Sequence, residues 1–270
     1  MFSPYYAWAR RSGPADAAHH VALNVALYGA GGKRWALTER GRKRLGQSEN
    51  RLDIGPSSVS WDGRGLTVEI DEWCSPLPTR VRGTVRLIPG AMPGRSFPLD
   101  AAGRHHWMPI APDAHIEVDL DRPGLRWSGE GYLDSNAGTR PLEADFTRWD
   151  WSRGVHRSGA SVLYDVERAD GTEMSLALRF DPRGGVEQHP SPPRLRLPST
   201  PLWRVPRFTG SEGAAKVAAT WEDTPFYARS AIRSRLFGED VLAMHESLSL
   251  RRFTSPIVQM MLPFRMPRLA

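Results

Sequence analysis

Apolar and polar residues alternate along short stretches of this chain, and turn residues separate the stretches. Alternation at every second position is the period of a half-buried β-strand, because successive side chains of a strand point to opposite faces. The strand-like stretches include residues 21–28 (VALNVALY), 66–70 (LTVEI), 80–88 (RVRGTVRLI), 114–120 (AHIEVDL) and 174–180 (MSLALRF). Asp62-Gly63 and Asp170-Gly171 each stand between two strand-like stretches, and Asp-Gly pairs in this position predict hairpin turns.

Helical patterns are rare in the sequence. Residues 213–219 predict one or two helical turns at most, and residues 256–262 (PIVQMML) predict a short apolar helix that begins at a proline. The chain contains 25 glycines and 23 prolines, a content that favours many short strands over long helices. We therefore predict an all-β protein of the barrel or sandwich kind.

A proline-rich segment at residues 181–207 is the clearest candidate for a linker. Its prolines include Pro190, Pro192, Pro193, Pro198, Pro201 and Pro206. Proline has no backbone N–H to donate, so this segment is predicted to be extended and to lie on the surface. It predicts an N-terminal β domain at residues 1–185, and then the linker and a C-terminal β domain at residues 186–270. The same proline pattern would also arise if the segment were one long strap across a single domain.

The chain is basic, with a net charge of +6 and a sequence pI near 9.9. Residues 33–44 hold six basic residues against one acid, and the last twenty residues hold four arginines and no acid. No helix-turn-helix, zinc-finger or RNA-binding signature accompanies this charge, so we expect no nucleic-acid partner. The charge predicts either a solvated face or contact with an anionic lipid surface. No run of about 18 apolar residues predicts a membrane span.

The sequence lacks the patterns of several common catalytic and metal sites. Cys74 is the one cysteine, which excludes an internal disulfide and fits a reducing compartment. The histidines, among them His105 and His106, show no zinc-binding spacing, so we expect no metal. Residues 29–32 (GAGG) lack the strand and helix that flank a phosphate-binding loop, and they predict a turn.

Aromatic residues are abundant, with ten tryptophans in the chain. They line an apolar cavity or simply fill the core between β-sheets, and their number alone does not decide between these two interpretations. Several of them flank Asp134. This aspartate begins the stretch 134–138 (DSNAG), whose composition predicts an Asx turn.

Many stretches of the sequence resemble the carotenoid 1,2-hydratases, the hydroxyneurosporene synthase family. In the N-terminal third they are FSPYYAWARR (2–11), ALNVALYG (22–29), RWALTERG (34–41), IDEW (70–73) and VRGTVR (81–86). The middle of the chain adds RHHWMPIAP (104–112), WSGEGYLDSNAG (127–138) and WDWSR (149–153). The C-terminal part adds EDTPFYARS (222–230), HESLSLRRF (245–253) and LPFRMPR (262–268). They follow one another in collinear order over essentially the whole chain.

The resemblance implies tandem lipocalin-like (calycin-type) β-barrel domains with an apolar pocket. It also implies cofactor-independent addition of water to the terminal C1–C2 double bond of an acyclic carotenoid, such as neurosporene or lycopene, in carotenoid biosynthesis. Such a substrate dissolves in the bilayer, so we expect a cytoplasmic protein in peripheral contact with the inner or photosynthetic membrane. Residues 256–264, flanked by arginines, are expected either to touch lipid or to pack as a short core helix.

In that family an acid in a Tyr-x-Asp motif, with an upstream His-x-Trp motif, is held responsible for catalysis. The matching residues are Tyr132, Asp134, His105 and Trp107. We expect Asp134 to protonate the alkene, because a carboxyl group buried among aromatic residues keeps its proton. Trp107, together with either Trp127 or Tyr132, is expected to stabilise the resulting carbocation, and His105 to hold the attacking water. The expected substrate contacts are Trp127, Tyr5, Tyr6, Trp149, Trp151 and Asn136.

Two other functions fit the same features. A lipocalin-like carrier binds a polyene without reacting and does not depend on Asp134, whereas a polyene cyclase of the same fold uses the acid to rearrange its substrate. Family members also carry a further leading segment before the FSPYY stretch at residues 2–6. We therefore expect residues upstream of Met1, since a first barrel without its opening strand has an open edge.

Overall fold

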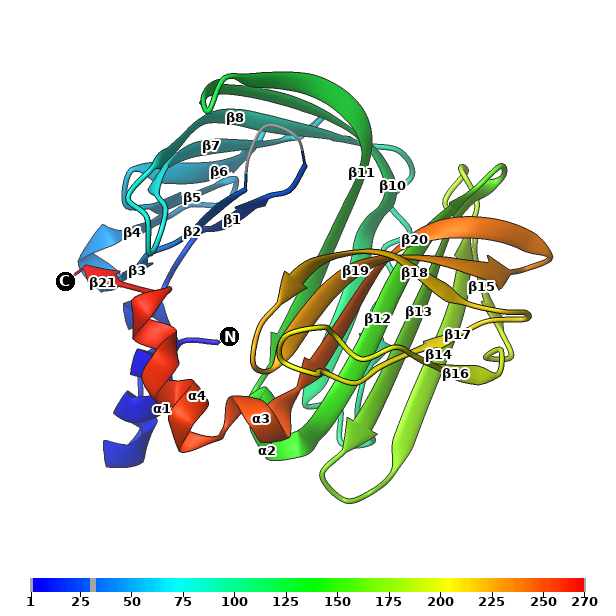
Figure 1. The fold of residues 1–270 in the computed structure, drawn as a ribbon. Coiled ribbons are helices and arrows are strands. Elements are labelled where there is room, and N and C mark those ends of the chain that lie inside the picture. Colours follow the sequence, from blue (N-terminus) through cyan, green and yellow to red (C-terminus); the bar gives the residue numbers. More distant parts are fainter. Residues whose placement is uncertain (1, 30–32, 270) are drawn as a thin grey trace. The chain divides into compact units, whose positions relative to one another are not determined.

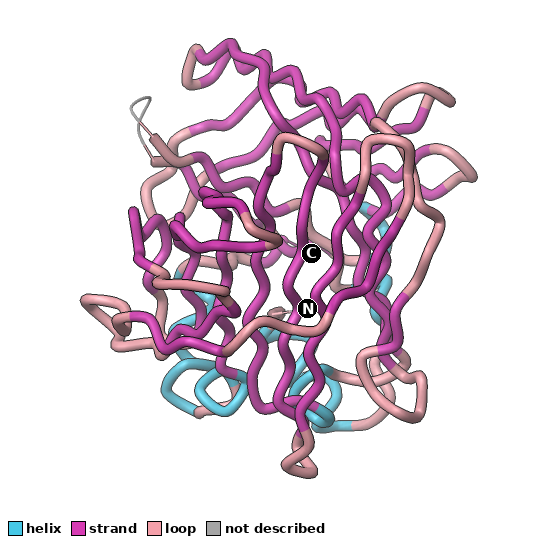
Figure 2. The backbone as a smooth tube through the Cα atoms, turned by 90° about the vertical axis from the view of Figure 1, so that its right-hand side faces the viewer, coloured by secondary structure: helices cyan, strands magenta, loops and turns pink. Residues whose placement is uncertain are grey.

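The computed structural model describes residues 2–29 and 33–269, which fold into two compact units (Figure 1). Unit 1 comprises residues 1–89, 114–131 and 259–270, and unit 2 comprises residues 90–113 and 132–258. Strands dominate both units, and the helices are short segments (Figure 2). The prediction of an all-β protein is therefore confirmed, and neither large sheet closes into a complete barrel within the described ranges.

Unit 1 is built on an antiparallel sheet with the strand order β11-β10-β8-β7-β6-β5-β4. These strands are β4 (Leu45–Gln47), β5 (Arg51–Ile54), β6 (Ser57–Trp61), β7 (Leu66–Trp73), β8 (Arg80–Pro89), β10 (His105–Arg122) and β11 (Leu125–Gly138). The last two continue into unit 2. Two smaller sheets pair β1 (Asn24–Leu27) with β2 (Arg34–Leu37), and β3 (Glu39–Arg40) with β21 (Arg268–Leu269). The helical elements are α1 (Pro4–Ala9), η1 (Arg10–Ser12), η2 (Ala17–His19), η3 (Arg42–Arg44) and η4 (Leu262–Phe264).

Both predicted hairpin turns are confirmed. Asp62 lies between β6 and β7, and its Oδ1 accepts the backbone N–H groups of Arg64 and Gly65, each at 2.8 Å. Asp170 lies between β13 (Gly159–Arg168) and β14 (Glu173–Phe180), and its Oδ1 accepts the backbone N–H of Thr172 at 2.9 Å. The glycine after each aspartate has a φ of +87°, which residues with a side chain rarely adopt.

Unit 2 is built on an antiparallel sheet with the strand order β15-β14-β13-β12-β20-β19-β18. Besides β13 and β14, these strands are β12 (Phe146–His156), β15 (Val186–His189), β18 (Lys216–Asp223), β19 (Tyr227–Leu236) and β20 (Glu239–Ser249). The other elements are β9 (Phe97–Pro98), β16 (Arg194–Leu197), β17 (Arg207–Gly210), α2 (Leu142–Asp145) and α3 (Leu250–Phe253). The helix α4 (Pro256–Met261) begins in unit 2 and ends in unit 1.

The two faces of the unit 2 sheet differ in chemistry. Trp149 and Trp151 of β12 point to one face, whereas Asp150 between them points to the other. The Asp150 face is covered by β17, because the backbone N–H of Phe208 donates to Asp150 at 3.3 Å. His245 of β20 donates from Nε2 to the Phe208 carbonyl at 2.8 Å. The aromatic face is the one that carries the candidate site.

The predicted division at residue 185 does not coincide with the two units. β15 pairs with β14 and β20 pairs with β12, so strands from both sides of residue 185 share one sheet. The proline-free stretches of the segment 181–207 form β16 and part of β17, which pair with each other. Residues 186–189 of this segment thus join the central sheet of unit 2 as β15, whereas β16 and β17 form a separate two-stranded sheet.

One helix predicted from the sequence is present and another is not. The C-terminal helix is confirmed, since α4 spans Pro256–Met261 and η4 follows it. The helical turn predicted at 213–219 is wrong, because Lys216 and Val217 pair with β19 and hydrogen bonds to that strand replace those of a helix. The turn predicted at 29–32 falls mostly on residues 30–32, which lie outside the described residues.

Asp165 of β13 provides a test of burial in unit 2. Burial raises the pKa of this carboxyl to about 6, and the hydroxyl of Ser175 offsets only part of that rise. Because the folded protein holds the proton more tightly than the unfolded chain, this stabilisation is complete below the ordinary pKa of 3.8 and is lost as the pH rises through about 6. We expect Asp165→Asn to raise the thermal midpoint by about 2–4 °C near pH 7.5 and to leave it unchanged near pH 3.5. Thermal unfolding followed by circular dichroism checks this, and an equal shift at both pH values would contradict it.

Candidate active site

Asp134 accepts two hydrogen bonds on one carboxylate oxygen. The indole Nε1–H of Trp107 on β10 lies 2.7 Å from Oδ2, and the phenol O–H of Tyr132 lies 2.9 Å from the same atom. Tyr132 and Asp134 are two residues apart on β11, so their side chains share a face of the strand. Within the described ranges no residue donates to Oδ1. The proton of a neutral Asp134 is therefore expected on Oδ1, because Oδ2 already accepts two donors.

The stretch DSNAG is strand and not the Asx turn that its composition predicts. β11 continues to Gly138, and the following Thr139 donates its backbone N–H to the Arg104 carbonyl at 3.0 Å. β11 is the neighbour of β10 in the sheet, and that neighbour binds the backbone groups that an Asx turn would have satisfied. The Asp134 carboxylate is thereby left to accept the side-chain donors of Trp107 and Tyr132.

Aromatic rings surround the Asp134 carboxyl group. Trp107 is fully buried, and its ring centre lies 5.6 Å from that of Phe97 and 5.2 Å from that of Tyr164. The ring of Tyr132 lies 5.2 Å from the ring of Trp151. Rings at these separations pack favourably and remove water from the groups between them. The result is an apolar environment for an acid that stands on a strand.

The pKa of Asp134 is raised above the ordinary value for an aspartate. Burial is the largest cause, while the hydrogen bonds from Trp107 and Tyr132 act in the opposite direction because they favour the ionised form. The pKa of Tyr132 is raised well above its ordinary range by burial and by the neighbouring Asp134. Tyr132 therefore keeps its proton and remains a donor at neutral pH.

His105 lies two residues before Trp107 on β10, but no hydrogen bond joins it to Asp134 within the described part of the chain. Its Nε2 lies 2.7 Å from Oδ2 of Asp145, the last residue of α2. Both side chains are buried. Asp145 also pairs with two guanidinium groups, those of Arg104 at 3.0 Å and Arg140 at 3.3 Å. The contact fixes β10 against α2 at the point where the strand begins.

Three of the six predicted substrate contacts lie in the unit that holds Asp134. Trp149 and Trp151 stand on the aromatic face of β12, where Trp149 is buried and Trp151 is partly exposed. Asn136 follows Asp134 by two residues on β11 and accepts the Tyr164 hydroxyl at 3.1 Å. These side chains extend the wall around the carboxyl group along the strands.

The other three predicted contacts belong to unit 1. The ring of Tyr5 packs at 5.5 Å on Trp8, and the ring of Tyr6 packs at 5.1 Å on His20. Trp127 is 47% exposed and borders a hollow lined mostly by polar residues of β7, β8, β10 and β11. All three therefore have a packing or surface environment within unit 1, and their contact with a substrate stays a prediction.

Three side chains of the site were not predicted from the sequence, and one of them is Phe97, which packs on Trp107. Tyr164 packs on Trp107 and holds Asn136, and Asp145 holds His105. The strand pattern of residues 161–167 (SVLYDVE) does place Tyr164 with the apolar residues, which was the one available signal. Nothing in the local sequence around Asp145 indicates a partner 40 residues away.

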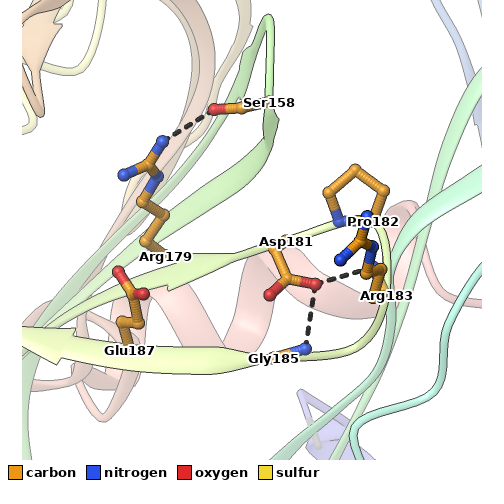
Figure 3. A pocket seen from close by; sticks show the side chains of 7 residues that line it. All are labelled: Ser158, Arg179, Asp181, Pro182, Arg183, Gly185 and Glu187. Carbon is orange, nitrogen blue, oxygen red and sulfur yellow. Dashed lines mark hydrogen bonds between the residues drawn. The ribbon is translucent and has the colours of Figure 1, made fainter.

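A separate hollow lies at the turn between β14 and β15 (Figure 3). Its volume is about 430 Å³, and it is lined by Ser158, Arg179, Asp181, Pro182, Arg183, Gly185 and Glu187. Arg179 donates to the Ser158 hydroxyl at 2.7 Å, and Asp181 accepts the backbone N–H of Arg183 at 2.6 Å. The hollow shares no residue with the aromatic site, and its charged lining does not suit an apolar ligand.

The fold and the site define a class of protein, namely an all-β, lipocalin-like protein that holds a desolvated acid among aromatic side chains. The chain belongs to the carotenoid hydratase CrtC family, whose model matches residues 1–270. This is a family of hydro-lyases. Within the described ranges no helix is both long and apolar enough to cross a membrane.

Two curated relatives are both named acyclic carotenoid 1,2-hydratase. The protein of Thiocapsa roseopersicina is 59% identical over 270 residues, which cover 99% of this chain and 67% of the relative. The protein of Rubrivivax gelatinosus is 49% identical over 277 residues, covering 100% of this chain and 68% of the relative. A solved structure from Nitrosomonas europaea, assigned to AttH, superimposes with a TM-score of 0.56 over 84% of this chain and 85% of its own, at 12% identity. That likeness supports the lipocalin-like fold and no more.

Proposed function

We propose that this protein adds water across the terminal C1–C2 double bond of acyclic carotenoids such as neurosporene or lycopene. The observation that carries the proposal is Asp134, whose pKa is raised by burial and whose Oδ2 accepts both Trp107 and Tyr132. The names of the relatives supply the reaction, since they are called acyclic carotenoid 1,2-hydratases. Protonation of an unactivated alkene needs a carboxyl group that still carries its proton at the working pH, and the burial of Asp134 favours that form.

The reaction starts with proton transfer from Asp134. The π electrons of the double bond take the proton from Oδ1 and form the new bond at C2, which leaves a tertiary carbocation at C1 and a carboxylate on Asp134. The two donors on Oδ2 then stabilise this carboxylate, because hydrogen bonds to a charged acceptor are stronger than those to a neutral one. The same contacts that lower the pKa at rest therefore lower the barrier to proton transfer.

Aromatic rings stabilise the cation until water reaches it. Trp107 is fully buried under Phe97 and Tyr164, so its part is to donate through Nε1. Tyr132 and Trp151 are partly exposed, and their rings are the ones that face the C1 cation in this proposal. Each ring contributes about 0.5–1 kcal/mol while it is exposed to water and about 2 kcal/mol once the substrate has displaced that water.

Water completes the addition. Its oxygen forms the bond to C1, and the proton that it loses returns to the Asp134 carboxylate, which restores the neutral acid. His105 is engaged with Asp145 through Nε2, so we propose that it acts by positioning β10, and Trp107 with it, in place of holding the water. Overall, one alkene and one water molecule give one tertiary alcohol.

His105→Asn tests this positioning role. We expect kcat to fall by roughly tenfold while KM stays unchanged, and the thermal midpoint to fall by about 2–6 °C, because the buried Asp145 loses a charge-assisted partner. Steady-state kinetics and thermal unfolding measure the two effects. His106→Asn is the matched control, since this neighbouring ring meets the Gly103 carbonyl at the surface. An unchanged kcat in His105→Asn would contradict the role.

The substrate dissolves in lipid, so we propose that the protein works at the cytoplasmic surface of the inner or photosynthetic membrane. A long polyene does not pass from the bilayer into water, because transfer of each CH₂ group into water costs about 0.8 kcal/mol. The enzyme must then meet its substrate at the membrane surface.

Isotope labelling separates the proposed function from its alternatives. The protein is incubated with lycopene or neurosporene in water enriched in ¹⁸O, and the products are analysed by mass spectrometry. A labelled tertiary hydroxyl is the expected result. Unchanged substrate that stays bound to the protein would instead identify a carrier, and an unlabelled isomer would identify a cyclase.

A further inference from the structure

Unit 1 carries a set of exposed apolar side chains that the proposed chemistry does not use. They are Trp73 and Leu77, at the turn between β7 and β8, and Met260, Met261 and Phe264, on α4 and η4. Phe264 is 76% exposed, Leu77 74% and Met260 64%. Large apolar side chains exposed to this degree in one region mark a contact site more often than a solvated face. We name these five residues the apolar surface.

Three contacts hold the parts of the apolar surface together. The hydroxyl of Ser75, next to the Leu77 turn, donates to the Phe264 carbonyl at 2.7 Å. The backbone N–H of Ser75 donates to the Trp35 carbonyl at 3.2 Å, and the guanidinium of Arg265 lies 4.3 Å from the centre of the Trp35 ring. The β7–β8 turn and the C-terminal segment, drawn in red in Figure 1, are thus joined within unit 1.

The backbone around Phe264 is held in place, although the side chain of Phe264 is exposed. Leu262 and Met266, two residues to either side, are only 9% and 5% exposed. The backbone N–H groups of Arg265 and Met266 both donate to the Leu262 carbonyl, at 3.0 and 2.8 Å. The exposure of Phe264 is therefore a property of an ordered turn, and its side chain is presented to whatever lies outside.

The sequence around the apolar surface is basic. Residues 73–82 contain Arg80 and Arg82, and residues 259–269 contain Arg265 and Arg268. Three of these arginines are paired with acids, Arg80 with Asp71, Arg82 with Asp121 and Arg268 with Glu39. Arg265 has its ring contact on Trp35 but no acidic partner in the described part of the chain. Apolar side chains with arginines beside them match an anionic lipid surface, where the former enter the headgroup region and the latter meet phosphates. A second copy of the chain would instead bring the same arginines face to face.

We propose that the apolar surface docks unit 1 onto an anionic lipid bilayer. Phe264 and Leu77 enter the interface, and Arg265 binds the lipid phosphates beside them. This goes beyond the proposed reaction, because docking needs neither Asp134 nor a carotenoid. The apolar surface would bring the protein to the membrane in which its substrate is dissolved.

Vesicle flotation without carotenoid tests the docking surface. The full chain is mixed with vesicles of phosphatidylcholine alone or with phosphatidylglycerol, and the floating fraction gives the partition coefficient. We expect the wild-type chain to bind the anionic vesicles. The double variant Phe264→Ser/Leu77→Ser is expected to lower the partition coefficient by roughly a hundredfold, about tenfold for each side chain. Leu202→Ser is the matched control, since Leu202 is also 74% exposed but belongs to unit 2. Arg265→Gln is expected to weaken binding and to reduce its salt dependence.

Three outcomes would overturn the proposal. The first is that the wild-type chain does not float with anionic vesicles, and the second is that the double variant floats as well as the wild type. The third is that the wild-type chain forms a dimer in solution and the double variant does not. Hydration of detergent-dispersed lycopene is measured in parallel, and we expect the double variant to keep it. A chain that floats but does not hydrate would refute the proposed function and leave the docking surface standing.

Discussion

Replacing Asp134 by asparagine is expected to lower kcat/KM for lycopene or neurosporene by about a thousandfold. The amide oxygen of asparagine still accepts Trp107 and Tyr132, but the amide has no proton that an alkene can take. The thermal midpoint is expected to stay within about 2 °C of the wild-type value, because the amide has nearly the size of the carboxyl group and still accepts both donors. Product formation measured by chromatography, together with thermal unfolding, checks both parts.

The matched control for this variant is Asp113→Asn. Asp113 is a partly buried aspartate on β10 in the same unit, and its carboxylate takes no part in the proposed chemistry. We expect this variant to keep wild-type activity. Full turnover by Asp134→Asn would refute the acid even if the product proved to be the hydroxy carotenoid.

Tyr132→Phe is expected to have the next largest effect. It removes one donor from Oδ2 of Asp134 and leaves the ring that packs on Trp151. A hydrogen bond to a charged acceptor contributes about 1.5–3 kcal/mol, so we expect kcat to fall by roughly 10- to 150-fold. Because the lost donor had favoured the ionised form, the pKa of Asp134 rises further.

The pH profile separates this effect from a loss of packing. Activity requires the protonated acid, so it falls as the pH rises through the pKa of Asp134. In Tyr132→Phe that fall is expected at a higher pH than in the wild type, even though the maximal rate is lower. Tyr164→Phe is the matched control, since its hydroxyl binds Asn136 and not Asp134. An unshifted profile in Tyr132→Phe would contradict the assignment of Tyr132.

The strands could be predicted from the sequence because their signals are local. The Asp-Gly turns at Asp62 and Asp170 depend on residues within three positions, and both form as the pattern predicts. The mistaken helix at 213–219 has the opposite origin. Its residues tolerate either conformation, and the pairing of β18 with β19 decides the outcome.

The candidate site depends on contacts that local sequence does not encode. The composition of DSNAG predicts a turn, yet pairing in the sheet makes it strand and turns Asp134 toward Trp107, 27 residues away. Only the resemblance to a family directed attention to Asp134, and even then Tyr164 was missed. Its part depends on β13 packing against Trp107, a tertiary contact.

The proposed role of Asp134 as the proton donor depends on burial that favours the protonated carboxyl group. Infrared difference spectra of wild type minus Asp134→Asn, recorded over a pH series, isolate the C=O stretch of this one protonated carboxyl. We expect a band that disappears as the pH rises, with a midpoint above the ordinary aspartate pKa of 3.8 and in step with the loss of kcat/KM. A midpoint at or below 3.8, or activity that persists after the band is gone, would contradict it.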